Sequence, residues 1–87
     1  MSVSFAATAF SVSLADGRSL VIPLDWYPRL QLASLQERED WQLLGDGYAI
    51  QWPAVDEHIS TEGLVAGRKS GESVQSLDRF RESRRSI

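Results

Sequence analysis

The sequence predicts an α+β domain: a small antiparallel sheet of about four strands, formed by two hairpins, with one or two short helices on one face. The strands are predicted by two Asp/Gly turns, each of which lies between apolar runs of strand length. A Ser-x-x-Glu pattern between the two hairpins predicts a helix. A chain of 87 residues forms one domain and buries only roughly 60 to 65% of its unfolded surface, so a partner or a second copy would add to its stability.

The first hairpin is predicted around Asp16 and Gly17, a pair that readily adopts the positive φ values of a tight turn. Before this pair, residues 10–14 alternate apolar with small polar side chains, as expected for a strand with one buried face. After it, residues 20–22 form a second β-rich run. Pro23 ends this run because proline has no N–H to donate to a neighbouring strand.

Helical structure is predicted between the two hairpins. Residues 26–30 contain bulky rings and a proline, so we expect a turn there and one helical turn after Pro28. Ser34 and Glu37 have the spacing of a capping box, in which the serine hydroxyl accepts from the Glu37 amide and the carboxylate accepts from the Ser34 amide. A short helix should therefore begin at Ser34.

The second hairpin is predicted around the Gly-Asp-Gly turn at residues 45–47, with strands at 41–44 and 48–52. Ser60 is a candidate N-cap for a further short helix. Gly67 should end that helix, because glycine readily adopts the left-handed conformation that follows a helix.

Charge and composition divide the chain into a domain at residues 1–67 and a flexible basic tail at residues 68–87. Three basic against nine acidic side chains give the domain a net charge of −6, whereas six against three give the tail +3. A polar linker opens the tail, and its apolar residues provide only a weak helical spacing, so we expect it to be mostly disordered. Its basic residues are Arg68, Lys69, Arg79, Arg81, Arg84 and Arg85.

Two groups of residues carry a resemblance to a known family. The front group is Asp16-Gly17-Arg18, Pro23-Leu24 and Trp26-Tyr27-Pro28-Arg29-Leu30; the more specific back group is Ile50-Gln51-Trp52-Pro53, Asp56-Glu57-His58-Ile59-Ser60 and Glu62-Gly63-Leu64. The pattern resembles the small bacterial proteins of domain-of-unknown-function family 2442 over residues 10–67. His58 departs from it, standing where the family usually has an acidic residue, which weakens any role that needs a third carboxylate there.

This resemblance implies a module without an established enzymatic activity or cofactor. Family members are often encoded beside a short protein of another uncharacterised family, in an arrangement like that of a toxin and its antitoxin. Some members carry an added helix-turn-helix domain, for which this chain has no room. The resemblance therefore implies a partner-binding module without its own DNA-reading domain.

Aromatic and acidic residues are the candidates for binding a protein partner, because large rings contribute strongly to interfaces and acids steer a basic partner. An open alternative is that the rings fill a thin core, which is the favoured interpretation for Trp41 and Trp52. The predicted partner-binding residues are Trp26, Tyr27, Trp52, Asp56, Glu57 and Glu62.

The main functional hypothesis is a non-enzymatic, antitoxin-like interaction module that holds a small, basic, toxin-like protein, or a second copy of the chain. No catalytic residue, metal ligand or cofactor is predicted. One alternative is a small metal-binding or hydrolytic protein that uses Asp56, Glu57 and His58. The other is a DNA-binding accessory acting through the Arg-rich tail, since the acidic domain itself opposes contact with phosphates.

We expect a soluble, cytoplasmic protein. Residues 1–10 lack the basic start of a signal peptide, and no run reaches the ~18 apolar residues needed to cross a bilayer. The chain has no cysteine, which fits a reducing compartment and excludes both thiol catalysis and Cys-based zinc sites.

Overall fold

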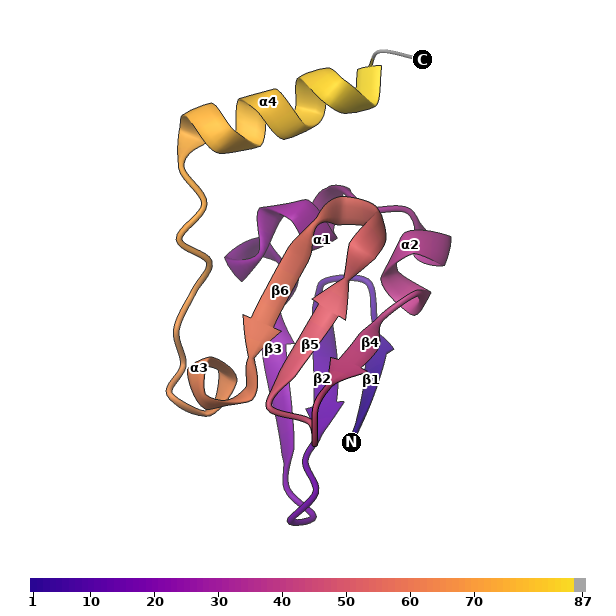
Figure 1. The fold of residues 1–87 in the computed structure, drawn as a ribbon, viewed down its shortest axis with the longest axis vertical. Coiled ribbons are helices and arrows are strands. Elements are labelled where there is room, and N and C mark those ends of the chain that lie inside the picture. The colour runs from indigo at the N-terminus through magenta and orange to yellow at the C-terminus, as the bar shows by residue number, and fades with distance from the viewer. Residues whose placement is uncertain (86–87) are drawn as a thin grey trace.

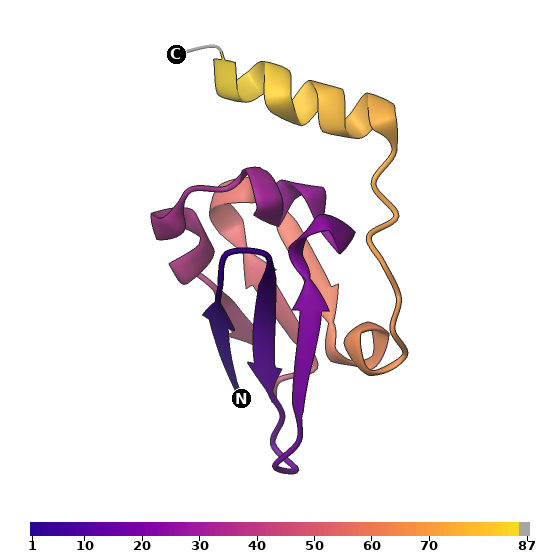
Figure 2. The same cartoon turned by 180° about the vertical axis from the view of Figure 1, so that it is seen from behind.

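The computed structural model describes residues 1–85, within which six strands form two three-stranded antiparallel sheets with orders β1-β2-β3 and β4-β5-β6. The sheets lie one behind the other, and short helices cover one end of both (Figures 1 and 2). The strands are β1 (Ser2–Phe5), β2 (Ala9–Ser13), β3 (Ser19–Pro23), β4 (Gln42–Leu44), β5 (Ala49–Trp52) and β6 (Glu57–Ser60). The helices are η1 (Leu24–Trp26), α1 (Pro28–Leu32), α2 (Leu35–Glu39), η2 (Pro53–Val55), α3 (Thr61–Val65) and α4 (Val74–Arg85).

The α+β class and both predicted hairpins are confirmed, and each hairpin gains a third strand. β1 pairs with β2, and β6 pairs with β5, so two sheets of three strands replace one sheet of about four. These two strands were not predicted because neither is bounded by a hairpin turn of the kind that signals the other strands. Each pairs instead across a short connection without glycine, residues 6–8 for β1 and residues 53–56, which include η2, for β6.

Strict alternation along the first sheet buries one face and exposes the other. Val3 lies opposite Val12, and Phe10 lies opposite Ile22, so all four point into the core. The outer face consists mostly of small side chains, apart from the exposed Val21: Ser2, Ser4, Ala9, Ser11, Ser13 and Ser19. This alternation is the feature that fixes the register of the sheet, because a slip of one residue would expose the apolar set.

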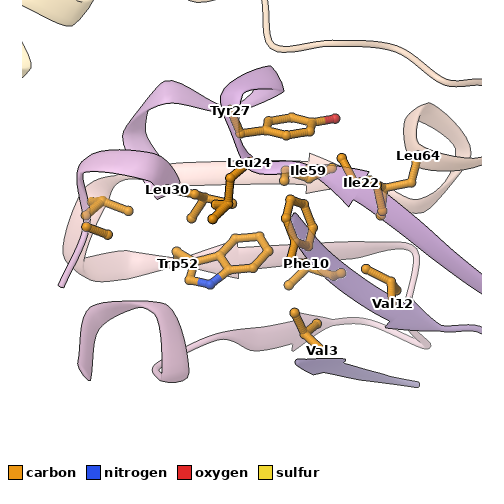
Figure 3. Packing of buried hydrophobic residues seen from close by; sticks show 13 residues of the cluster. Val3, Phe10, Val12, Ile22, Leu24, Tyr27, Leu30, Trp52, Ile59 and Leu64 are labelled. Atoms are coloured by element: carbon orange, nitrogen blue, oxygen red, sulfur yellow. The ribbon is translucent and has the colours of Figure 1, made fainter. Parts of the chain in front are cut away.

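The core lies between the two sheets and centres on the fully buried Trp52 (Figure 3). The Trp52 ring makes edge-to-face contacts with Phe5 and Phe10, at centroid distances of 6.3 and 6.2 Å. Its indole N–H donates to the Arg38 carbonyl at 3.0 Å, so the one polar atom of the ring has a partner. Leu30 of α1 belongs to the same buried cluster as Trp52, which ties the helical end of the domain to both sheets (Figure 3).

The predicted helix boundaries are confirmed by their caps. Pro28 is the first residue of α1, and α2 has the complete capping box between Ser34 and Glu37. The Ser60 hydroxyl accepts from the Gly63 amide at the start of α3. At its end, Gly67 adopts a φ of 74°, and two hydrogen bonds close a Schellman motif.

The C-terminal segment contains the helix α4, and this corrects the expectation of a mostly disordered tail. The sequence predicted a mostly disordered segment, but the structure has a helix over Val74–Arg85 that crosses the end of the domain where α1 and α2 lie (Figures 1 and 2). The reason is that the segment docks through one ring, Phe80, and through ion pairs whose partners lie far away in the sequence.

The domain boundary predicted at residue 67 stays a prediction, and Ser86 and Ile87 of the predicted tail lie outside the described residues. No helix within residues 1–85 combines the length and apolar character that crossing a membrane requires.

Replacing Ser34 with Ala should lower the free energy of unfolding by about 0.5–2 kcal/mol, because its hydroxyl accepts from the Glu37 amide at 3.1 Å. Urea unfolding followed by Trp fluorescence measures the change. Ser4→Ala, on the exposed outer face of β1, is the control and should change stability by no more than about 0.5 kcal/mol. Equal midpoints for Ser34→Ala and the parent would contradict a stabilising cap.

Candidate functional site

Arg29 of α1 joins the domain to residues 66–73, the linker between α3 and α4. Its guanidinium donates to both carboxylate oxygens of Glu72, at 2.6 and 3.2 Å, in a bidentate pair. The same group donates to the Val55 carbonyl at 3.1 Å. Both side chains of the pair are mostly buried, and the guanidinium lowers the pKa of Glu72. The linker is therefore held against α1 and η2.

The far end of α4 is held by a second bidentate pair. The Arg84 guanidinium donates to the two carboxylate oxygens of Glu37 at 2.7 and 3.0 Å. Hydrogen bonds from Arg84, and then from the Ser34 amide, lower the pKa of Glu37 to about 2. Between the two ion pairs, the ring of Phe80 lies under Arg29 and Arg84, whose guanidinium carbons are 4.8 and 5.2 Å from its centroid.

Two hollows lie near these contacts, and of the two only the first is lined by residues of α4. One, of about 430 Å³, lies between α4 and η2 and is lined by Pro53, Val55 and Phe80 among others. The second, of about 500 Å³, borders α2 and is here called the acidic hollow; its lining residues are Gln36, Glu37, Glu39, Asp40 and Ala54. The helix is thus attached by charges and one ring, not by a continuous apolar seam.

Two of the predicted partner-binding rings belong to the core. Trp52 is fully buried, and Tyr27 is 5% exposed and donates from its hydroxyl to the Arg68 carbonyl at 2.8 Å. Neither ring offers a surface to a partner in this fold, because the two sheets and the linker cover them. Trp26 is half-buried at the surface, and the Lys69 ammonium lies 5.2 Å from its ring centroid.

The three predicted acids do not form one patch. Asp56 adopts the left-handed conformation, with a φ of 52°, and turns the chain into β6 with its side chain 98% exposed. Glu57 is half-buried on the core side of β6. Glu62 is exposed in the first turn of α3, beyond the other end of β6 (Figure 1). Their role in binding stays a prediction.

The metal hypothesis involved Asp56, Glu57 and His58, of which Asp56 turns the chain before β6 while Glu57 and His58 point to opposite faces of that strand. Across residues 1–85, no group of three or more His, Asp or Glu side chains is close enough to hold a metal ion.

The DNA hypothesis involved the basic tail. Its Arg79 and Arg81 are exposed on α4, whereas Arg84 pairs with Glu37. Part of the positive charge of α4 is thus used by the domain itself.

Comparison with known proteins gives a family and a similar fold. Residues 1–70 match the family described as Protein of unknown function (DUF2442). The chain belongs to this family. A protein of unknown function from Rhodospirillum rubrum has a similar crystal structure, with 25% sequence identity and a TM-score of 0.68, covering 82% of this chain and 88% of that one. No curated protein matches the chain significantly.

The family match ends at residue 70, just before α4. The docking residues Arg29 and Glu37 lie inside the matched region, whereas Glu72, Phe80 and Arg84 lie outside it. Sequence reasoning missed these contacts. The available signal was the helical spacing of apolar residues in the tail, but nothing local indicates which distant acid pairs with which arginine.

Acid should release α4. The pKa of Glu37 is about 2 in the folded chain, against an ordinary value of 4.5, so its ion pair contributes stability above about pH 4.5 that is lost as the pH falls towards 2. The NMR signals of the α4 amides and of the Phe80 ring, followed from pH 6 to 2, should report this loss. Glu37→Gln keeps the cap acceptor but not the charge, so α4 should already be loosened at pH 6. An α4 equally docked in both proteins at pH 6 would contradict the role of the pair.

Proposed function

We propose that this chain is a non-enzymatic, antitoxin-like protein-interaction module that binds a small, basic, toxin-like partner protein. The binding surface is the acidic hollow beside α2. The absence of cysteine is consistent with work in a reducing cytoplasm.

The observation that carries the proposal is the docking of α4. A helix with four arginines against two acids is held on the acidic domain by the Arg84–Glu37 pair at 2.7 Å. The domain therefore has a surface that accepts a basic helical segment, and the contact needs little apolar area. A partner segment of similar chemistry would find Glu39 and Asp40 exposed beside Glu37.

The distribution of charge supports the same partner. Residues 1–67 carry a net charge of −6, which attracts a basic protein and raises its association rate at low salt. Charges at the rim of an interface mainly set this rate and the choice of partner. The acidic hollow places three of the nine acids of the domain together: Glu37, Glu39 and Asp40.

The test compares proteins that copurify with two charge-reversed variants and with the parent in the native host. Glu39→Lys combined with Asp40→Lys should abolish recovery of a basic partner and slow its association several-fold, because both acids line the hollow. Mass spectrometry identifies the partner, and binding kinetics at two salt concentrations measure the rate.

Asp25→Lys combined with Asp46→Lys is the matched control. Both residues are exposed acids outside the acidic hollow, and the change in net charge is the same. Binding that survives in the control but not in the first variant supports the acidic hollow. Equal binding in all three proteins, or equal loss in both variants, contradicts it.

A further inference from the structure

Helix α4 fills the surface on which it docks only partly. Within residues 74–84, Phe80 is the one side chain of the helix that packs against the buried core, whereas Val74 is 73% exposed. About one turn to either side of Phe80 stand Ser76 and Ser83, and both line the 430 Å³ hollow between α4 and η2. The helix therefore turns two short polar side chains towards this hollow.

The domain side of the same hollow is apolar at η2. Pro53 and Ala54 are exposed, and Val55 is part of the buried core. Ala54 lines the acidic hollow as well, so the two hollows adjoin. Together they form one surface, here called the helix groove, with an apolar part at Pro53, Ala54 and Val55 and an acidic part at Glu37, Glu39 and Asp40.

The charged residues around the apolar part do not oppose a basic ligand. Arg29 is already neutralised by its bidentate pair with Glu72. Asp56 is exposed and acidic. Arg79 lines the hollow from α4, so its positive charge leaves with the helix. Without α4, the groove presents uncovered apolar side chains beside a cluster of acids.

The helix is an addition to the domain that forms the groove. All six groove residues lie inside the family match over residues 1–70, whereas α4 lies entirely outside it. The groove thus belongs to the part of the chain that is shared with the family.

We propose that the helix groove binds an amphipathic basic helix of the partner protein in place of α4. This inference rests on the proposed function, because it names the segment of the partner that binds there and the element that competes with it. The partner helix directs arginines or lysines at the acidic part. It carries larger apolar side chains where α4 has Ser76 and Ser83.

Two opposing effects decide which helix occupies the groove. The partner helix buries more apolar surface against η2 than α4 does, which favours the partner. The linker keeps α4 close to the groove, at an effective concentration on the order of mM, which favours α4. The Arg84–Glu37 pair at 2.7 Å adds to the hold of α4. The chain's own helix is therefore an intramolecular competitor of the partner.

The test uses a blocked synthetic peptide with the sequence of residues 73–85 and with Ser83→Leu, titrated into the ¹⁵N-labelled full chain. The amides of Ala54 and Asp40 should shift saturably. The peptide should bind the full chain with Arg84→Ala roughly tenfold more tightly than the parent, because the competing helix is then held less firmly. Arg81→Ala, an exposed arginine of α4, is the matched control and should bind the peptide as the parent does.

A second variant places the larger side chain in the chain's own helix. Ser83→Leu in the full chain should fill the hollow, slow the hydrogen exchange of the α4 amides and weaken peptide binding several-fold. Gln75→Leu introduces the same side chain at an exposed position of α4 that does not line the hollow. It should leave peptide binding unchanged.

The absence of saturable shifts in the Arg84→Ala chain overturns the inference, as does equal peptide affinity for that chain and the parent. Equal affinity for Ser83→Leu and Gln75→Leu also overturns it. Failure of the proposed function looks different: a native partner binds regardless of Glu39→Lys with Asp40→Lys, while the peptide still competes with α4. Conversely, a partner that needs those two acids, with a peptide that ignores the state of α4, overturns the helix groove alone.

Discussion

The burial of Trp52 is the constraint on which the rest of the structure depends. Its ring contacts Phe10 of the first sheet, while its indole N–H donates to the Arg38 carbonyl of α2. One side chain thus holds both sheets and the helical end together. In a domain this small, a single large ring supplies a substantial part of the apolar surface removed from water. The Pro53 that follows starts η2, which supplies the Val55 carbonyl to Arg29, so the attachment of the linker follows from the position of this ring.

Charges that are separated along the chain are brought together by folding. The domain is acidic and the C-terminal segment basic, and α4 crosses the end of the domain where Glu37 lies. Each ion pair in this contact is bidentate and partly or mostly shielded from water, so it is stronger than an ordinary surface pair. The ring of Phe80, enclosed by two guanidinium groups, adds the apolar part of the contact.

Local patterns predicted the local structure. The Asp16-Gly17 turn, the Ser34–Glu37 capping box and the Ser60 N-cap act over a few residues, so each could be recognised in the sequence. The third strand of each sheet is joined to its hairpin by a short connection without glycine, which gives no recognisable turn signal. The docking of α4 was missed for a different reason, because Arg84 and Glu37 lie 47 positions apart. The burial of Tyr27 was also missed. An aromatic residue looks the same in sequence whether it fills a core or faces a partner.

Glu37 serves two elements at once, and this links them energetically. Its Oε1 accepts from the Ser34 amide at 2.8 Å and from Arg84 at 2.7 Å, while Oε2 accepts from Arg84 at 3.0 Å. A foreign cation can bind this carboxylate fully only by displacing Arg84. Thermodynamic reciprocity then requires that whatever favours the undocked helix raises the affinity for that cation by the same factor, and that the cation in turn favours undocking. The C-terminal segment thereby competes with any other cation for this carboxylate.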